Sequence, residues 1–330
     1  MKYDLFEDIE KIKGLTEIEA LFQLEKPSIF KVKGKDSSKA VLISSLIHGN
    51  EPSGFRAILK EINSEQQYPI DVYFFIGNVA SAKIEPYFSN RLIPGKQNFN
   101  RTWVNNPQTE LELTSRELLD FFKTLPLIAV LDLHSFTAQN TPPHCMTVDS
   151  KSSEIAQKFV PYIFELDIPL GAMIEQTKDI PSFVIECGTN NTQDADEFAL
   201  KTLQRFFIEF KIKNGDNQNI SKGIFSHATN IKIKQDVKIK FSDKKEDADL
   251  TVRKDCQSLN ITEVASHTIY GWGNSLDVFE MKDKNGTVSP DTYFFIEDGK
   301  ILFKKDIVPN FMATNQKIAK ESGFYFFEKK

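Results

Sequence analysis

A strand and a helix are joined by the stretch Ala40-Val41-Leu42-Ile43-Ser44-Ser45-Leu46-Ile47-His48-Gly49-Asn50-Glu51. Its first eight residues form an apolar run that predicts a buried strand, and residues 53–62 carry apolar side chains at the spacing of one helical face. His48 and Glu51 therefore fall at a strand-to-helix turn, where Gly49 lets the backbone bend without a steric penalty. An imidazole and a carboxylate three residues apart can point at one spot, as in a metal site. Glu51 could also simply favour the positive end of the helix, because such a pair recurs by chance.

Three further apolar runs predict more strands of the same sheet, and the stretches between them predict helices. The strands are expected over residues 71–78, 126–135 and 182–188. The helices are expected over residues 114–123, 152–164 and 194–210, the first opened by a capping box at Thr114 to Glu117 and the last by the pair Asp194 and Glu197. This alternation of strands and helices predicts an α/β fold with parallel strand pairs. Residues 1–39 are interpreted as an exposed lead-in with one short helix near 15–21.

The hydrophobic period changes after residues 213–219, which are polar and turn-prone and predict a linker. Apolar and polar residues alternate over 231–241, and residues 293–303 predict a hairpin around an Asp-Gly turn. The predicted domains are a catalytic α/β domain over residues 1–212 and a smaller, mainly β domain over 220–330, which we expect to shape the substrate entrance.

The composition and net charge of the chain argue against some classes of binding partner. The chain has 330 residues, 40% of them hydrophobic, and a net charge of -5, which argues against a nucleic-acid or anionic-membrane partner. We find neither a secretory signal at the acidic N-terminus nor a membrane-spanning apolar run. The three cysteines are widely spaced, which suggests no disulfide framework. A cytoplasmic protein is the default expectation, and the oligomeric state, a homo-oligomer included, stays open.

Polar residues at the ends of two more strands complete a candidate site. Asp132 and His134 share a face of their strand, and the carboxyl ends of parallel strands meet at one edge of an α/β sheet. His48, Glu51 and His134 are two imidazoles and a carboxylate, a common ligand set for one catalytic Zn²⁺ ion that leaves a position for water. Such a site suits amide hydrolysis. Glu186, a carboxylate inside an apolar strand, is the best candidate for the general base.

The order of these motifs resembles the succinylglutamate desuccinylase and aspartoacylase family, which belongs with the zinc carboxypeptidases. The resemblance rests on the motif H-G-N-E at 48–51, Asn100-Arg101, Asp132-Leu133-His134-Ser135 and Glu186 within Phe183-Val184-Ile185-Glu186-Cys187-Gly188. It covers roughly residues 38 to 210 and implies a mixed central sheet with flanking helices, as in the zinc carboxypeptidases, followed by a second domain.

The resemblance also implies roles for single residues. His48, Glu51 and His134 would be the zinc ligands, and Glu186 would activate water and protonate the leaving amine. Arg91 would stabilise the oxyanion, and Asn100 and Arg101 would hold the substrate carboxylate. Asp132 is expected to be a hydrogen-bond partner of a ligand rather than a ligand itself.

Other candidates have weaker support. His144 is the one rival ligand, while His227 and His267 are expected to be ordinary surface or loop histidines. Aspartoacylase-like members carry an arginine before the catalytic glutamate, and here Lys178 or Gln176 would have to substitute for it. Tyr270 is the candidate for the family's C-terminal substrate-contacting tyrosine.

The predicted function is zinc-dependent hydrolysis of the linear amide of an N-acyl amino acid that has a free carboxylate. Two alternatives stay open. One is a zinc carboxypeptidase acting on short or cell-wall peptides, and the other is a non-catalytic, metal-free binding protein. The sequence specifies neither the acyl group nor the amino acid.

Overall fold

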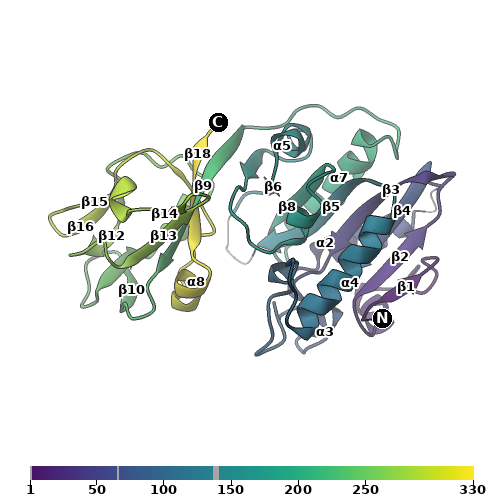
Figure 1. The fold of residues 1–330 in the computed structure, drawn as a ribbon, viewed down its shortest axis with the longest axis horizontal. Coiled ribbons are helices and arrows are strands. Elements are labelled where there is room, and N and C mark those ends of the chain that lie inside the picture. Colours follow the sequence, from purple (N-terminus) through teal and green to yellow (C-terminus); the bar gives the residue numbers. More distant parts are fainter. Residues whose placement is uncertain (1, 65–66, 137–140) are drawn as a thin grey trace. The chain divides into compact units, whose positions relative to one another are not determined.

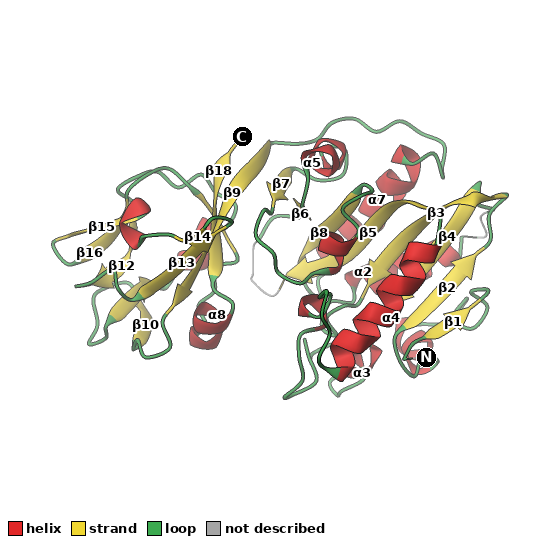
Figure 2. Cartoon of the chain, in the orientation of Figure 1, coloured by secondary structure: helices red, strands yellow, loops and turns green. Residues whose placement is uncertain are grey.

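A computed structural model describes residues 2–64, 67–136 and 141–330 of the chain (Figure 1). The chain divides into two compact units. The first consists of Met1–Thr137, Pro143–Ile163 and Pro169–Lys222, and the second of Ala138–Pro142, Phe164–Ile168 and Gly223–Lys330. Long helices belong to the first unit, and strands dominate the second (Figure 2). None of the helices in the described ranges is long and apolar enough to cross a membrane.

Strands and helices alternate in the first unit, as the sequence predicts. Its elements are β1 (Asp4–Phe6), α1 (Glu17–Phe22), β2 (Ser28–Val32), β3 (Asp36–Ser45), α2 (Ser53–Ile62), β4 (Ile70–Ile76), α3 (Val79–Ala82), the 3-10 turn η1 (Phe99–Arg101), α4 (Glu110–Thr124), β5 (Leu127–Phe136), β6 (His144–Thr147), α5 (Ser150–Ala156), α6 (Met173–Gln176), β8 (Ser182–Thr189) and α7 (Gln193–Glu209). Strand β7 (Tyr162–Glu165) begins in the first unit, and its last two residues belong to the second.

The central sheet of this unit is mixed. Its strand order includes β1-β2-β4-β3-β5-β8-β6. The pairs β3–β4, β3–β5 and β5–β8 are parallel, while β2–β4 and β6–β8 are antiparallel. The predicted α/β fold with a mixed central sheet and flanking helices is therefore confirmed. Because β3, β5 and β8 are parallel neighbours, their carboxyl ends lie at the same edge of the sheet.

Helices cover both faces of the sheet. On one face, α4 buries Leu118 and Phe122 against Leu42 of β3 and Phe75 of β4. Helices α2 and α7 pack against each other and against β5 and β8 on the opposite face (Figure 1). Apolar burial of this extent, at about 25 cal/mol per Å² of surface removed from water, is the main stabilising contribution to such a layered fold.

Four local predictions are wrong. Helix α4 begins at Glu110, because the capping box is formed by Thr109 and Glu112 rather than by residues 114–117. The predicted helix 152–164 ends at Ala156 and is followed by β7. Residues 1–39 are not a peripheral lead-in, because β2 pairs with β1 and β4 inside the sheet. The cap of α7 is Thr192 instead of the predicted acidic pair.

The second unit is built mainly from strands. Its elements are β9 (Gly223–Ile233), β10 (Ile239–Ser242), β11 (Leu250–Arg253), the 3-10 turn η2 (Cys256–Leu259), β12 (Ile269–Gly273), β13 (Phe279–Asp283), β14 (Gly286–Thr287), the 3-10 turn η3 (Pro290–Thr292), β15 (Phe294–Glu297), β16 (Lys300–Phe303), β17 (Val308–Asn310), α8 (Gln316–Glu321) and β18 (Phe324–Lys329). Strands β10, β11, β12, β16 and β15 form a five-stranded sheet. The predicted hairpin turns at Asp298-Gly299 between β15 and β16. A role of this part in shaping the substrate entrance stays a prediction.

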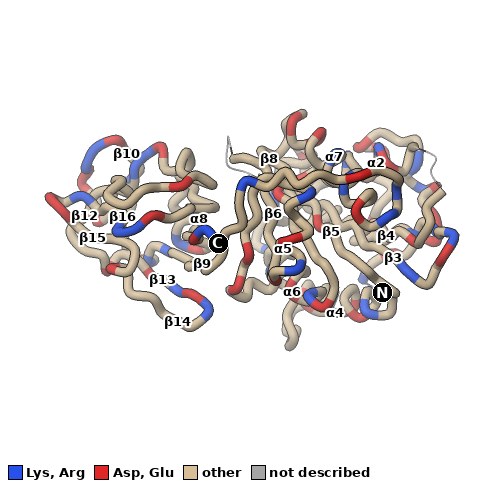
Figure 3. Tube along the Cα trace, turned by 90° about the horizontal axis from the view of Figure 1, so that it is seen from above, with Lys and Arg blue, Asp and Glu red and all other residues tan. Residues whose placement is uncertain are grey.

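Charged residues of both signs occur in both units. Figure 3 shows Lys and Arg next to Asp and Glu in both units, without a long segment of one sign. Many of them form ion pairs, such as Lys254 with Asp243 and Lys305 with Glu328. Exposed pairs of this kind are screened by water and add little to stability.

Candidate active site

The turn after β3 places His48 and Glu51 at the carboxyl edge of the sheet. Strand β3 ends at Ser45, and the buried Leu46 adopts a left-handed conformation with φ of 55°. A branched residue in this region carries backbone strain, which proteins retain at functional sites. The turn continues to Pro52, which caps α2 without a side-chain hydrogen bond. Glu51 is thus free to point away from the helix and into the site.

Gly49 is required by close approach rather than by a bend. Its N–H donates to the carbonyl oxygen of Arg91 at 3.1 Å. A Cβ at this position would lie 2.6 Å from the backbone nitrogen of Ala82 and 2.7 Å from the carbonyl oxygen of Asn90. Any other residue would therefore push the loop that carries Arg91 away from the turn.

Three buried side chains meet at this edge. Among the described residues, His48, Glu51 and His134 form a group whose ligand atoms all lie within 4.8 Å of one another. Glu51 lies between the two histidines, with Oε1 2.9 Å from His48 Nδ1 and Oε2 2.8 Å from His134 Nδ1. Each side chain is only 2–3% exposed. The predicted ligands from β5 and from the turn after β3 are thus brought together.

The protonation of His48 and Glu51 matches what a cation would need. Burial, followed by the charge of Arg91, lowers the pKa of His48 to about 4, so its ring is neutral. Burial alone would raise the pKa of Glu51, but the charges around it hold that pKa well below the usual range. His48 Nδ1 makes no hydrogen bond. A ring lone pair and a carboxylate oxygen 2.9 Å apart repel each other unless a cation or a proton lies between them, so the residues fit a bound metal ion.

The second nitrogen of each ring contacts an acceptor outside the group. His134 Nε2 lies 3.0 Å from Asp132 Oδ2, and His48 Nε2 lies 3.0 Å from Asn98 Oδ1. Burial alone would lower the pKa of His134, but the carboxylates of Asp132 and Glu51 raise it well above its usual value. Contacts of this kind orient metal-binding imidazoles and leave the other nitrogen for the ion. Asp132 therefore occupies the position expected of a supporting residue.

Glu186 lies on β8, directly beside His134. The two residues are partners in the parallel register of β5 and β8, so their side chains share a face of the sheet. Glu186 Oε2 is buried and has no hydrogen-bond partner. Burial raises the pKa of Glu186 to about 8. A carboxyl group with a pKa close to neutrality can both accept and return a proton at physiological pH.

Positive side chains come from the loop between α3 and α4. Arg91 Nη1 donates to Glu51 Oε1 at 2.5 Å, and its side chain is 42% exposed. Asn100 is buried in η1, and its Oδ1 has no hydrogen-bond partner. Arg101 is exposed in the same turn and donates from Nη1 to the carbonyl oxygen of Asn100 at 2.7 Å. Stacking of Phe99 on Trp103, with ring centroids 5.8 Å apart, fixes this turn to the core.

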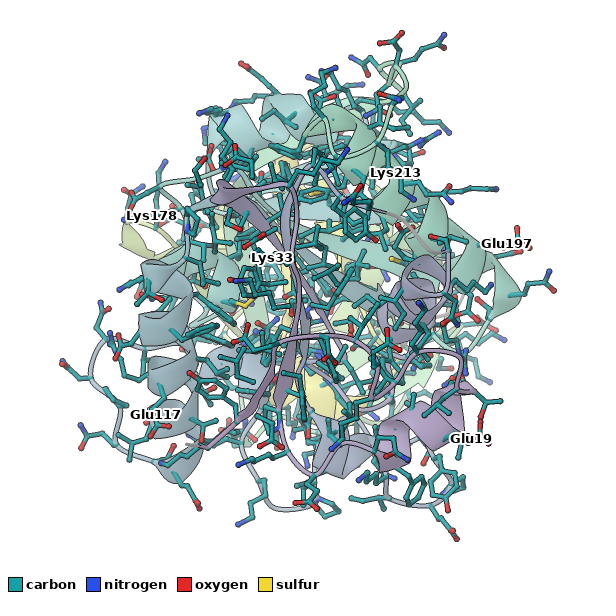
Figure 4. All side chains as sticks on the ribbon, turned by 90° about the vertical axis from the view of Figure 1, so that its right-hand side faces the viewer. Glu19, Lys33, Glu117, Lys178, Glu197 and Lys213 are labelled. Carbon is teal, nitrogen blue, oxygen red and sulfur yellow. The ribbon has the colours of Figure 1, made fainter. Side chains whose placement is uncertain are left out.

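The weaker candidates are placed elsewhere. Tyr270 is 1% exposed inside the aromatic core of the second unit, so its side chain offers no surface to a substrate. Lys178 is exposed between α6 and β8, at the outer edge of the view in Figure 4. Gln176 donates to the carbonyl oxygen of Trp103 at 3.0 Å, so its amide is already engaged. His144 is buried opposite Glu186 on β6, against the ring of Phe136, and does not join the ligand group.

Residues 37–203 match the model of the succinylglutamate desuccinylase/aspartoacylase catalytic domain. The chain belongs to the succinylglutamate desuccinylase/aspartoacylase family. Members of this family are hydrolases that remove acyl groups. The matched residues include the turn after β3, the loop of Arg91 and η1, β5 and β8, which supply every residue of the candidate site. Among curated protein sequences, none matches this family member.

Solved structures of the family have the same fold. A succinylglutamate desuccinylase/aspartoacylase from Rhodobacter sphaeroides is 13% identical, with a TM-score of 0.61, and the match covers 92% of this chain and 88% of that chain. A succinylglutamate desuccinylase from Vibrio parahaemolyticus is 14% identical, with a TM-score of 0.63, and the match covers 91% of this chain and 86% of that chain. An aspartoacylase family protein from Mesorhizobium loti is 13% identical, with a TM-score of 0.55, and the match covers 92% of this chain and 88% of that chain. At such identities the likeness shows the fold alone.

Metal binding to this family member should release protons. His134 carries a proton near neutral pH because its pKa is raised, and an imidazole must lose that proton to bind a metal ion. The affinity for a divalent metal ion should therefore still rise about tenfold per pH unit through pH 7, whereas the low pKa of His48 adds no competition there. Calorimetry in buffers of different ionisation enthalpy measures the protons released. Fewer than one proton released per metal ion at pH 7 would contradict the assigned protonation of His134.

The contact between Asn98 and His48 was not predicted from the sequence. The sequence predicted no role for Asn98. Asparagine is strongly favoured at helix N-caps, and Asn98 stands directly before the turn that contains Asn100 and Arg101. That local signal predicts a cap. Its contact with His48, fifty residues away in the sequence, required the tertiary structure.

Proposed function

We propose that the protein is a zinc-dependent hydrolase that cleaves the amide of an N-acyl amino acid and releases a carboxylic acid and an amine. The observation that carries this proposal is the meeting of His48, Glu51 and His134 in one buried group beside Glu186. Family membership supports the class of reaction, and the donor set supports the choice of zinc. The substrate class is inferred from the loop that contains Asn100 and Arg101.

His48, Glu51 and His134 would hold the ion through two nitrogens and a carboxylate. Zinc, when bound there, supplies a Lewis acid for the carbonyl group and a lower pKa for a nearby water molecule. The protein's own contribution is the arrangement around the ion. Asp132 orients His134 at 3.0 Å, and burial keeps water from competing with these contacts.

Glu186 would take the proton of the attacking water and return it to the leaving nitrogen. Its carboxyl group is on the strand next to His134, and its unpaired Oε2 is available for a hydrogen bond with the reacting water. Because its pKa of about 8 reflects burial, a nearby cation would lower that pKa and favour the form that accepts a proton. General acid–base catalysis of this kind contributes about 10²–10⁴-fold to a rate.

Arg91 and Arg101 would act on the two ends of the substrate. The partly exposed guanidinium of Arg91, held next to Glu51, is placed to stabilise negative charge that develops on the carbonyl oxygen. The exposed guanidinium of Arg101, with the amide of Asn100, would bind the free carboxylate of the substrate. We do not assign Lys178 or Tyr270 a part in substrate binding, since one is at the periphery and the other in a core.

The test is release of free amine from N-succinyl, N-acetyl and other N-acyl amino acids and from short peptides, with zinc-loaded protein. Cleavage of an acyl amino acid is the expected result, and it would identify the substrate. Cleavage of peptides alone would replace the proposal with a carboxypeptidase. Absence of cleavage across the whole panel, with one zinc ion bound per chain, would contradict the proposed substrate class.

A further inference from the structure

Asn98 lies between the candidate metal site and the segment proposed to bind the substrate carboxylate. It occupies the N-cap of η1, and its Oδ1 accepts a hydrogen bond from the backbone N–H of Asn100 at 2.9 Å. The same oxygen lies 3.0 Å from His48 Nε2. One side-chain atom therefore touches both a proposed ligand and the turn that contains Asn100 and Arg101.

These two contacts determine the protonation of His48. The backbone N–H of Asn100 can only donate, so the amide atom that faces it must be the oxygen rather than the nitrogen of Asn98. That oxygen can only accept, so His48 Nε2 must be the protonated nitrogen of a neutral ring. The lone pair is then on Nδ1, which lies 2.9 Å from Glu51 Oε1 without a hydrogen bond. Asn98 thus aims the metal-binding nitrogen of His48 at the centre of the ligand group.

The two proposed ligand histidines are supported by different chemistry. His134 Nε2 contacts the carboxylate of Asp132, whereas His48 Nε2 contacts a neutral amide. The amide also holds a backbone group of η1, whereas the hydrogen-bond partner of Asp132 is His134, within β5. The neutral amide polarises its imidazole less than a carboxylate would. With Asn98 as its partner, His48 is therefore a less basic ligand than it would be beside a carboxylate. In return, Asn98 links His48 to the turn that contains Asn100 and Arg101.

We propose that Asn98 is a positioning residue that couples metal binding at His48 to the order of the Asn100–Arg101 turn. The effect of Asn98 on metal binding depends only on the ligand group. Its effect on substrate binding, through the Asn100–Arg101 turn, rests on the proposed function. Loss of a supporting partner of a ligand lowers metal affinity about 10–100-fold. Loss of an N-cap side chain leaves a backbone N–H of its turn without an acceptor, so the turn is less ordered. A change at Asn98 should produce both effects together.

The test compares Asn98→Ala, Asn98→Asp and Asp132→Asn. Zinc affinity is measured by competition with a chromophoric chelator, and the order of residues 98–101 is measured by amide hydrogen exchange with and without zinc. Asn98→Ala should bind zinc about 10–100-fold more weakly. In the unchanged protein zinc should slow exchange at Asn100, and this effect should be absent in zinc-saturated Asn98→Ala. Asn98→Asp retains both acceptor contacts, so it should bind zinc at least as tightly and keep the protection.

Asp132→Asn is the matched comparison. It should weaken zinc binding through His134 but keep the zinc-dependent protection of Asn100 once zinc is saturating, because the hydrogen bond of Asp132 goes to His134 and not to η1. Zinc affinity of Asn98→Ala within twofold of the unchanged protein would overturn the role at His48. Exchange at Asn100 that does not respond to zinc in the unchanged protein would overturn the coupling. Neither measurement uses turnover, so failure of the proposed function is detected separately, by the substrate panel.

Discussion

Replacing Glu186 by Gln should lower kcat about 1,000-fold while one zinc ion per chain remains bound. The amide has nearly the shape of the carboxyl group but cannot accept the proton of water. Glu186 lies beside the ligand group without belonging to it, since His48, Glu51 and His134 are the side chains that meet. The measurement is kcat on the substrate found in the panel, together with zinc content by plasma mass spectrometry.

The control for this prediction is Glu197→Gln. Glu197 is exposed on α7, and the same change of charge and shape there should leave both kcat and zinc content as they were. If Glu186→Gln retained a tenth or more of the original kcat, Glu186 would not be the general base. If it lost zinc as well, Glu186 would be part of the metal site, and the division between ligands and base proposed above would be wrong.

Replacing His134 by Ala should abolish zinc binding under conditions in which the unchanged protein holds one ion. Loss of a supporting partner alone costs about 10–100-fold in affinity, and loss of a ligand should cost more. The change also leaves the buried carboxylates of Glu51 and Asp132 without the ring between them. The free energy of unfolding of the metal-free protein should therefore fall by about 3 kcal/mol. Equilibrium dialysis against zinc and urea unfolding measure the two effects.

An exposed histidine provides the comparison for His134. His267 lies on the surface of the second unit, and His267→Ala should change neither zinc content nor stability by more than about 0.5 kcal/mol. Zinc retained at one ion per chain by His134→Ala would remove His134 from the ligand set. In that case His144, the other buried histidine beside Glu186, would be the residue to examine.

Local patterns in the sequence predict most of the layered fold. The apolar runs that become β3, β4, β5 and β8 are long and strongly hydrophobic, so burial decides their structure wherever they lie. Residues 53–62 match α2 in both bounds. The errors fall where the local signal is weak. The sequence offers two capping boxes near the start of α4, one at Thr109 and Glu112 and one at Thr114 and Glu117. The structure contains the first, so the helix already includes Thr114.

The boundary between α5 and β7 shows a second kind of limit. Residues 152–164 carry apolar side chains that suit a helical face, but the chain leaves the helix at Ala156 and forms β7 at Tyr162. Phe159 and Phe164 are buried by rings that come from distant parts of the sequence, namely Phe183 and Phe225. Tertiary packing overrides local propensity here, because burying an aromatic ring stabilises more than one additional helical turn.

The sequence by itself determined which residue types reach the carboxyl edge of the sheet. His48, His134 and Glu186 each follow or end a buried strand, and parallel strands bring such positions to one edge. Only the tertiary structure decided how their atoms meet. Glu51 lies between two ring nitrogens, and the lack of a side chain at Gly49 leaves room for the Arg91 loop to pack against the same turn. The protonation of His48 follows from an amide fifty residues away, because hydrogen bonds depend on distance in space rather than along the chain.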